Sequence, residues 1–264
     1  RFEHLTHLSI SCCLKVTEFP DVSGAMNLRE LILDGCKKLV RIHKSVGCLA
    51  NLVVLSASDC RKLHNFVPMH LPSLEYLSFS GCYRLAHFPE IKGTMDKPLS
   101  IDVSVTAIKK LPESIEKLTG LYSLDMSGCR ELSWVPSSLF VLPNFVTLVI
   151  SGCRGLAWFF TWFQRSHLAC PKLETLRFDS AHLTDIDLGR IIYKFPNLKH
   201  LIVPFNEFVS LPTHIKESTN LISLEVNLSR RLREIPELPS SIQKVNASSC
   251  TSLTSETTNM LWSQ

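Results

Sequence analysis

The chain has 264 residues, of which 45% are hydrophobic and 20% charged, and this composition excludes an intrinsically disordered polymer. Its 28 basic and 24 acidic residues give a formal net charge of +4. Because the basic residues form no long run, we expect neither nucleic acid nor a membrane surface as a partner. No apolar stretch reaches the about 18 residues that a transmembrane helix needs. The length exceeds one ordinary hydrophobic core, so the chain has either two domains or a repetitive architecture.

Seven of the ten cysteines share one local context, and their spacing sets a period for the whole chain. Each follows apolar residues placed eight, five and three positions earlier, as Leu28, Leu31 and Leu33 precede Cys36. Four further units carry another residue in the cysteine position, and one of them begins with Pro98 as its first apolar residue. The eleven marker positions, called the column below, are Cys13, Cys36, Cys60, Cys82, Thr106, Cys129, Cys153, Ala181, Asn206, Ser229 and Cys250.

This repeat of 21 to 28 residues, with its Leu-x-x-Leu-x-Leu core, is typical of the leucine-rich repeat. We therefore predict an α/β repeat fold, a leucine-rich-repeat solenoid with a concave parallel β-sheet and a convex face of short helices, 3₁₀ turns and loops. The segments that begin at Leu111-Pro112, Val135-Pro136 and Leu211-Pro212 have apolar residues at the spacing of a 3₁₀ turn. We expect about eleven repeats over residues 1–253 and a short C-terminal tail over 254–264.

The column cysteines have three interpretations, which are structural thiols, disulfides and metal ligands. Stacked side chains in a column point in one direction rather than toward each other, and the non-cysteine members would leave bridges without partners. No Cys-x₂-Cys or His-x₃₋₅-His pair is present, so no metal or other cofactor is expected. We favour small buried side chains that satisfy backbone groups, through a thiol, the hydroxyl of Thr106 or the amide of Asn206. Cys12, Cys48 and Cys170 lie outside the column and have no assigned chemistry.

Several segments add a more specific resemblance. The sequence from Pro20 to Leu39, the unit from Thr106 to Ile115, and the C-terminal run from Leu232 to Leu253 resemble plant intracellular immune receptors of the Toll/interleukin-receptor, nucleotide-binding, leucine-rich-repeat type. This resemblance implies a sensor that binds a pathogen effector or a guarded host protein and helps to restrain a nucleotide-binding switch. It also implies that the repeats are one part of a larger receptor in the cytoplasm or the nucleus. Because the first and last repeats have no polar cap, we expect flanking receptor domains to cover both ends.

The outward positions of the strands are the first place to expect a protein partner, because eleven strands about 4.8 Å apart give a sheet roughly 50 Å long. Tyr76, Tyr122 and Arg177 rank first, since tyrosine and arginine are common binding hot spots. Phe205 joins them because an aromatic residue there replaces the usual Ser-Gly after the strand. The full set of candidates is Arg29, Glu75, Tyr76, Tyr122, Asp125, Arg177, Lys199, His200, Ile202, Phe205 and Glu225. Ordinary exposed surface is the alternative for each of them.

Other features leave alternatives open. The aromatic run over 158–163 fits either core packing or an exposed patch for a neighbouring domain. Sequons at Asn227 and Asn246 keep an ectodomain fragment of an extracellular repeat receptor as an alternative, beside a general protein-binding scaffold outside immunity. An enzyme is not expected, because the sequence has no phosphate-binding loop, Gly-x-Ser-x-Gly or His-Glu-x-x-His motif.

Overall fold

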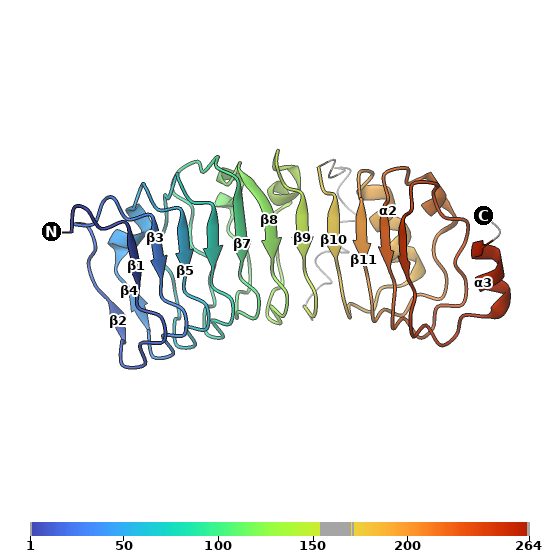
Figure 1. Cartoon of the computed structure of the whole chain (residues 1–264), viewed down its shortest axis with the longest axis horizontal. Helices are drawn as coiled ribbons and strands as arrows, with labels where there is room; N and C mark the ends of the chain where they lie inside the picture. The colour runs from blue at the N-terminus through green and yellow to red at the C-terminus, as the bar shows by residue number, and fades with distance from the viewer. Residues whose placement is uncertain (1, 154–169, 171, 263–264) are drawn as a thin grey trace. The chain divides into compact units, whose positions relative to one another are not determined.

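A computed structural model describes residues 2–153, 170 and 172–262 of the chain (Figure 1). The chain forms two compact units. Unit 1 comprises Arg1–Phe145 with Cys153–Trp158, and unit 2 comprises Val146–Gly152 with Phe159–Gln264. All eleven strands of the main sheet are parallel and follow chain order, β1-β3-β5-β6-β7-β8-β9-β10-β11-β12-β13. The predicted leucine-rich-repeat fold is therefore confirmed.

Unit 1 holds the first six strands of this sheet. Each is short because only the x-Leu-x portion of a repeat is extended, after which the chain turns away. A second sheet, made of β2 (Glu18–Phe19) and β4 (Arg41–Ile42), lies in the same unit. The main strands are β1 (His7–Ser9), β3 (Glu30–Ile32), β5 (Val54–Ser56), β6 (Tyr76–Ser78), β7 (Leu99–Asp102) and β8 (Leu121–Asp125).

Unit 2 holds the other five strands and both described α-helices. The strands are β9 (Thr147–Val149), β10 (Thr175–Arg177), β11 (His200–Ile202), β12 (Ser223–Glu225) and β13 (Lys244–Asn246). Helix α2 (Asp185–Lys194) begins at a capping box formed by Thr184 and Asp187. Helix α3 (Ser255–Trp262) lies within the predicted C-terminal tail.

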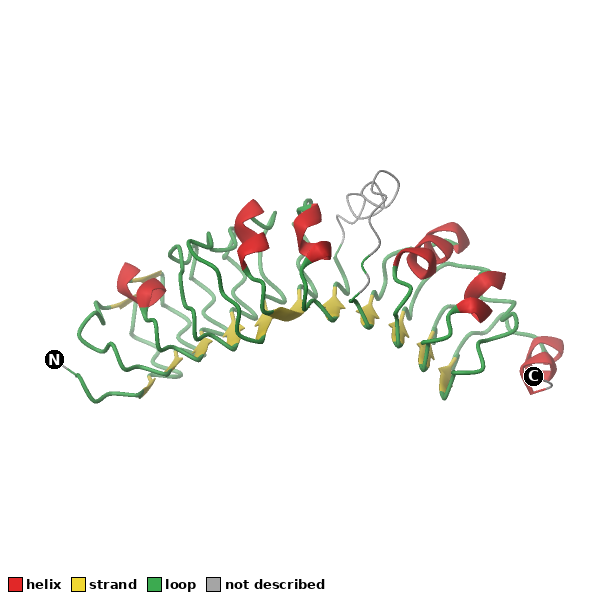
Figure 2. Cartoon of the chain, turned by 90° about the horizontal axis from the view of Figure 1, so that it is seen from above, coloured by secondary structure: helices red, strands yellow, loops and turns green. Residues whose placement is uncertain are grey.

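Short 3₁₀ helices connect several strands, and three of them follow the Leu-Pro or Val-Pro segments as predicted. These are η2 (Glu113–Lys117), η3 (Ser137–Val141) and η4 (Thr213–Glu217), while η1 (Lys44–Cys48) follows His43. Proline suits the position before η2, η3 and η4 because its restricted φ is compatible with the extended backbone there and it lacks an N–H that a helix start leaves unpaired. In each unit the helices that connect strands, η1 to η4 and α2, lie on the side opposite the main-sheet strands (Figure 2).

The core of each unit is a stack of equivalent apolar residues. Leu31, Leu55 and Leu77 occupy matching positions on three adjacent strands and are fully buried. One repeat alone could not bury these leucines. Burial stabilises the fold by about 25 cal/mol for each Å² of apolar surface, and this stabilisation depends on the repeats on both sides. The edge strands show the consequence, since Leu8 is half-buried and Val245 is 40% exposed.

One expected core position is wrong. Pro98 is exposed, and the neighbouring Leu99 is buried in its place. Proline lacks the N–H for the ladder, whereas the Leu99 N–H donates to Gly120 O at 3.0 Å. The replacement shifts the register, because Leu99 pairs with Leu121 while Ser100 pairs with Ser123. Tyr122 is consequently the extra residue of β8 at this irregularity.

The residue before each column position has a positive φ in all eleven repeats. Glycine occupies it four times, with φ between 67° and 73°. The other seven are Cys12, Asp59, Val105, Ser180, Phe205, Leu228 and Ser249, with φ between 54° and 63°. The predicted tight turn at the four glycines is thus confirmed, and the same left-handed turn ends every other strand of the main sheet.

Val105 is the most strained of these residues, because a β-branched side chain fits poorly at its φ of 56°. We expect Val105→Gly to raise the free energy of unfolding by about 0.5–1 kcal/mol, a partial gain since glycine also gives the unfolded chain more freedom. Gly128→Val, the reverse change in the next repeat, should lower it by about 1–2 kcal/mol. Urea unfolding measures both. A destabilised Val105→Gly variant would show that its side-chain packing outweighs the backbone strain.

Candidate protein-interaction face

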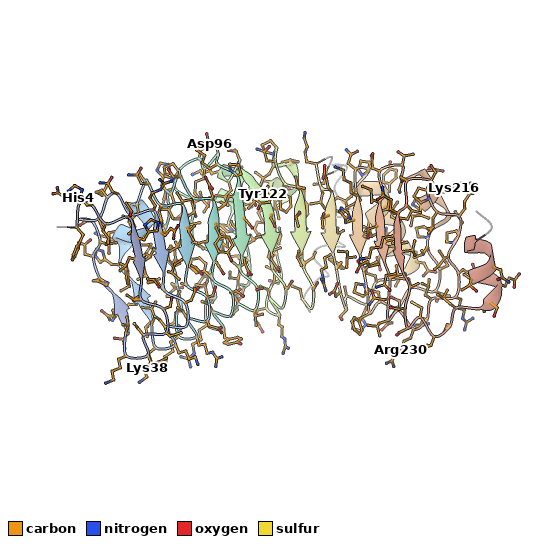
Figure 3. The ribbon with its side chains drawn as sticks, in the orientation of Figure 1. His4, Lys38, Asp96, Tyr122, Lys216 and Arg230 are labelled. Atoms are coloured by element: carbon orange, nitrogen blue, oxygen red, sulfur yellow. The ribbon has the colours of Figure 1, made fainter. Side chains whose placement is uncertain are left out.

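The candidate residues of unit 1 lie along the solvent side of its strands. Arg29 and Glu75 are exposed and occupy equivalent positions immediately before β3 and β6. Together with neighbours such as His4 and Lys97 they line an open hollow of about 520 Å³. Tyr76 on β6 and Tyr122 on β8 are 39% and 42% exposed, and Figure 3 marks Tyr122 on its strand. These candidates therefore lie on an open surface rather than in an enclosed pocket.

A network of serine and aspartate side chains covers the ends of these strands and was not predicted. Ser56 Oγ donates to Asp34 Oδ1 at 2.6 Å, and Ser58 Oγ lies 2.8 Å from Ser78 Oγ. Asp125 accepts a hydrogen bond at 2.7 Å from the backbone N–H of Ser127. Serine recurs two residues before the column position, as at Ser58 and Ser127, and was the available signal, because its hydroxyl or a nearby carboxylate satisfies the strand end.

In unit 2 the charged candidates are arranged as ion pairs. Glu174 and Lys199 approach to 2.9 Å, Arg177 binds Asp179 at 2.8 Å, and Glu225 pairs with Lys244. Surface pairs of this kind contribute little to stability, about 0–1 kcal/mol each. Their effect is to neutralise the face of unit 2 and to hold long side chains in place.

The apolar and aromatic candidates of unit 2 differ in location. His200 and Ile202 are half-buried on β11, where Ile202 is in register with Arg177 on one side and Glu225 on the other. Phe205 is 54% exposed, but it lies in the left-handed turn after β11. The structure therefore places Phe205 at the edge of the face, apart from the strand rows that carry the other candidates.

The column residues form a ladder of hydrogen bonds from one repeat to the previous one. Cys36 Sγ donates to Ile10 O at 3.1 Å, and Cys60, Cys82, Cys129, Cys153 and Cys250 make the equivalent bond at 3.1 to 3.2 Å. Thr106 Oγ1 donates instead to Val103 O in its own repeat at 2.8 Å. Cys13, in the first repeat, is exposed.

Asn206 does more than the column cysteines. Its Nδ2 donates to the carbonyls of Phe178, Val203 and Pro204 at 3.0 to 3.1 Å. Its Oδ1 accepts from the backbone N–H groups of Ala181 and Leu183 at 3.1 and 3.0 Å. One side chain, 3% exposed, thus satisfies five backbone groups across two repeats.

All ten cysteines carry free thiols. Burial raises the pKa of Cys82 and Cys153 from 9.0 to about 12, and that of Cys170 to about 11. A thiol whose pKa is raised in this way remains protonated at neutral pH and is a weak nucleophile. These cysteines therefore have the properties of packing residues.

Several further expectations can be placed. The aromatic residues of 158–163 lie outside the described part of the chain. Asn246 Oδ1 accepts hydrogen bonds from Ser248 within its own sequon, and Asn227 is half-buried. Among the described residues, no group of three or more His, Cys, Asp or Glu side chains could hold a metal ion. None of the described helices is long and apolar enough to cross a membrane.

Comparison with known families identifies the type of leucine-rich repeat in this chain. The profile of disease resistance protein RPS4B-like leucine-rich repeats matches residues 70–238, which is more than half of the chain. The chain belongs to this family. Its matched region includes the seven main-sheet strands from β6 to β12, and five of these strands carry candidate residues.

Two plant relatives contain a region similar to this chain within a longer protein. TMV resistance protein N of Nicotiana glutinosa is 27% identical, and the alignment covers 92% of this chain and 25% of that protein. Disease resistance-like protein CSA1 of Arabidopsis thaliana is 33% identical over 90% of this chain and 19% of its own. The chain thus spans about a quarter or less of these relatives. A solved leucine-rich-repeat domain, that of the type III effector XopL, is 19% identical, with a TM-score of 0.49 over 88% of this chain and 73% of that chain.

Proposed function

We propose that this chain is the protein-recognition part of an intracellular plant immune receptor. It binds a pathogen effector or a guarded host protein through the solvent side of its sheet. The observation that carries the proposal is the set of exposed aromatic and charged side chains, such as Tyr76, Tyr122 and Arg177, on the parallel strands of a resistance-protein repeat family. A continuous face of this type suits a protein surface better than a small molecule.

The chain contributes to recognition and restraint without catalysis or a cofactor of its own. The sequence has no motif for phosphate binding or for an activated nucleophile, which supports this part of the proposal. The edge strands β1 and β13 expose core positions at Leu8 and Val245, and we place contacts with flanking receptor domains there. The receptor acts in the cytoplasm or the nucleus.

The test uses a full-length receptor that carries these repeats. We expect Tyr76→Ala, Tyr122→Ala, Arg177→Ala or Phe205→Ala to abolish the effector-triggered cell death or to make it constitutive, because a hot-spot side chain contributes about 2 kcal/mol or more to binding. Cell death and receptor abundance are measured together in leaf tissue. Tyr193→Ala is the matched control, since Tyr193 is 78% exposed on α2, away from the strands. An unaltered response in all four variants at normal abundance would contradict the proposal.

A further inference from the structure

Two carboxylates of unit 1 are neighbours on the solvent side of the sheet. Asp102 on β7 is in register with Asp125 on β8. Adjacent strands are about 4.8 Å apart, and like charges at paired positions destabilise a sheet. In the part of the chain that the structure describes, neither carboxylate forms an ion pair with a cation. The pair therefore leaves negative charge uncompensated on this face.

Both carboxylates are held in fixed orientations. Asp102 Oδ1 accepts from the backbone N–H of Ser104 at 2.9 Å, and Asp125 Oδ1 accepts from that of Ser127 at 2.7 Å. The second oxygen of each carboxylate has no hydrogen-bond donor among the described residues. Burial raises the pKa of the nearby Cys129 thiol, and the charges of Asp125 and Asp102 raise it further. The two negative charges are thus held in fixed positions, close enough together that both raise the pKa of Cys129.

Two tyrosines lie beside this pair. Tyr76 is in register with Ser100, which is two residues before Asp102 on β7. Tyr122 is the extra residue between Leu121 and Ser123 of β8, and Ser123 also pairs with Ser100. The two exposed rings therefore come from the strands on either side of β7. Tyr122, labelled in Figure 3, precedes Asp125 by three residues on β8, and Tyr76 lies on the strand next to that of Asp102.

Unit 2 provides an internal contrast. There, Glu174, Asp179 and Glu225 each have a lysine or arginine of the same face as a partner. The paired carboxylates Asp102 and Asp125 of unit 1 have no such partner among the described residues. Charge complementarity thus favours a basic partner over a phosphate-bearing one at β6–β8.

We propose that the solvent side of β6–β8 binds an arginine-bearing segment of a protein partner. The guanidinium lies against Asp102 and Asp125, and the arginine stem lies beside Tyr76 and Tyr122. Arginine fits because its planar group carries five donors, enough for two carboxylates, and stacks on aromatic rings within about 6 Å. Lysine, a point charge with three donors, would bridge the pair less well. This inference rests on the proposed function and specifies the chemistry of its partner.

The experiment uses this chain and a fluorescent peptide in which arginine and leucine alternate, with binding measured by fluorescence anisotropy. We expect Asp102→Asn/Asp125→Asn to weaken binding about tenfold or more. A peptide with lysine in place of arginine should bind the unaltered chain several-fold less tightly. Glu113→Gln/Glu116→Gln is the matched control, because it removes two exposed charges from η2 on the helical side of the same unit and should leave binding unchanged.

Thermal unfolding provides an independent readout and shows that the variant folds. Removal of the like-charge pair should raise the unfolding midpoint by about 1–3 °C. A lower midpoint, equal peptide binding by the asparagine variant, or equal weakening by the Glu113/Glu116 control would each overturn the inference. If the peptide test fails in one of these ways while the full receptor still loses its response in Arg177→Ala or Phe205→Ala, which lie outside β6–β8, the proposed function stands and only the arginine-binding inference fails.

Discussion

Replacing Asn206 with leucine should lower the free energy of unfolding by about 3–5 kcal/mol, because a buried backbone group without a partner costs about 1–3 kcal/mol. The amide oxygen accepts from the backbone N–H groups of Ala181 and Leu183, and the amide nitrogen donates to three carbonyls. Leucine has the same branched shape and number of heavy atoms but satisfies none of these groups. Urea unfolding followed by circular dichroism gives the difference from the midpoint and slope.

Two control variants separate this effect from the mere loss of an amide. Asn206→Cys keeps a donor of the kind used elsewhere in the column, so it should destabilise less than leucine does. Asn220→Leu removes an exposed asparagine whose Nδ2 lies 3.0 Å from Asn197 Oδ1, and it should cost less than about 0.5 kcal/mol. Equal losses at residues 206 and 220 would show that the column asparagine has no special role in coupling repeats.

The strands and 3₁₀ turns could be predicted from the sequence because each repeat has the same pattern of apolar residues. Leu31 and Leu55 fix the buried side of their strands, and a period of two then places Glu30 and Val54 outward. Eleven agreeing copies overcome the weakness of any single short strand. The positions of the glycine turns followed from the same alignment.

Departures from the repeat were harder to predict. Helix α2 was missed although Thr184 and Asp187 form its capping box and Leu188, Ile191 and Ile192 form its buried side. The repeat pattern describes only the strand and the column residue, so it does not indicate a longer helix between strands. The pattern also placed Pro98 in the core. It does not reveal that Leu99, with an irregular register, satisfies the backbone hydrogen bonds of the sheet better.

The candidate face depends on relations between repeats that no single repeat contains. The outward position of Asp125 was predictable from its own strand, but its pairing with Asp102 depends on the register across the irregularity at Leu99. Similarly, Phe205 was expected to face solvent, and its φ of 55° explains why the turn holds it at the edge of the face. The periodicity of a strand thus predicts which side chains face solvent, whereas contacts between side chains of different strands depend on the register of the sheet.

Brief treatment of the native chain with a thiol reagent should modify three cysteines rapidly. Cys12, Cys13 and Cys48 are exposed, whereas the other seven are buried. At neutral pH, a pKa of about 12 in place of 9.0 leaves Cys82 and Cys153 with about a thousandfold less thiolate, even before access is considered. Mass spectrometry after the pulse counts the modified sites. Cys48→Ser should reduce the rapid group from three to two.

Unfolding without reductant should expose all ten thiols to the reagent. Fewer modified sites would mean that disulfides are present, which would favour the extracellular alternative. The comparison between native and unfolded chains is decisive because slow labelling has two causes, burial and bridging. Only bridged cysteines remain unreactive when the chain is unfolded.

Alkaline pH should destabilise the fold through ionisation of the buried thiols. The folded chain holds protons on Cys82 and Cys153 up to about pH 12, whereas the unfolded chain releases them above about pH 9, so stability is complete below pH 9 and falls above it. Each of these thiols should lower the free energy of unfolding by about 1.4 kcal/mol per pH unit in that window. Cys82→Thr should make the decline shallower, because threonine does not titrate and already occupies the column at Thr106. An equally steep decline in that variant would assign the alkaline loss to groups other than the column thiol.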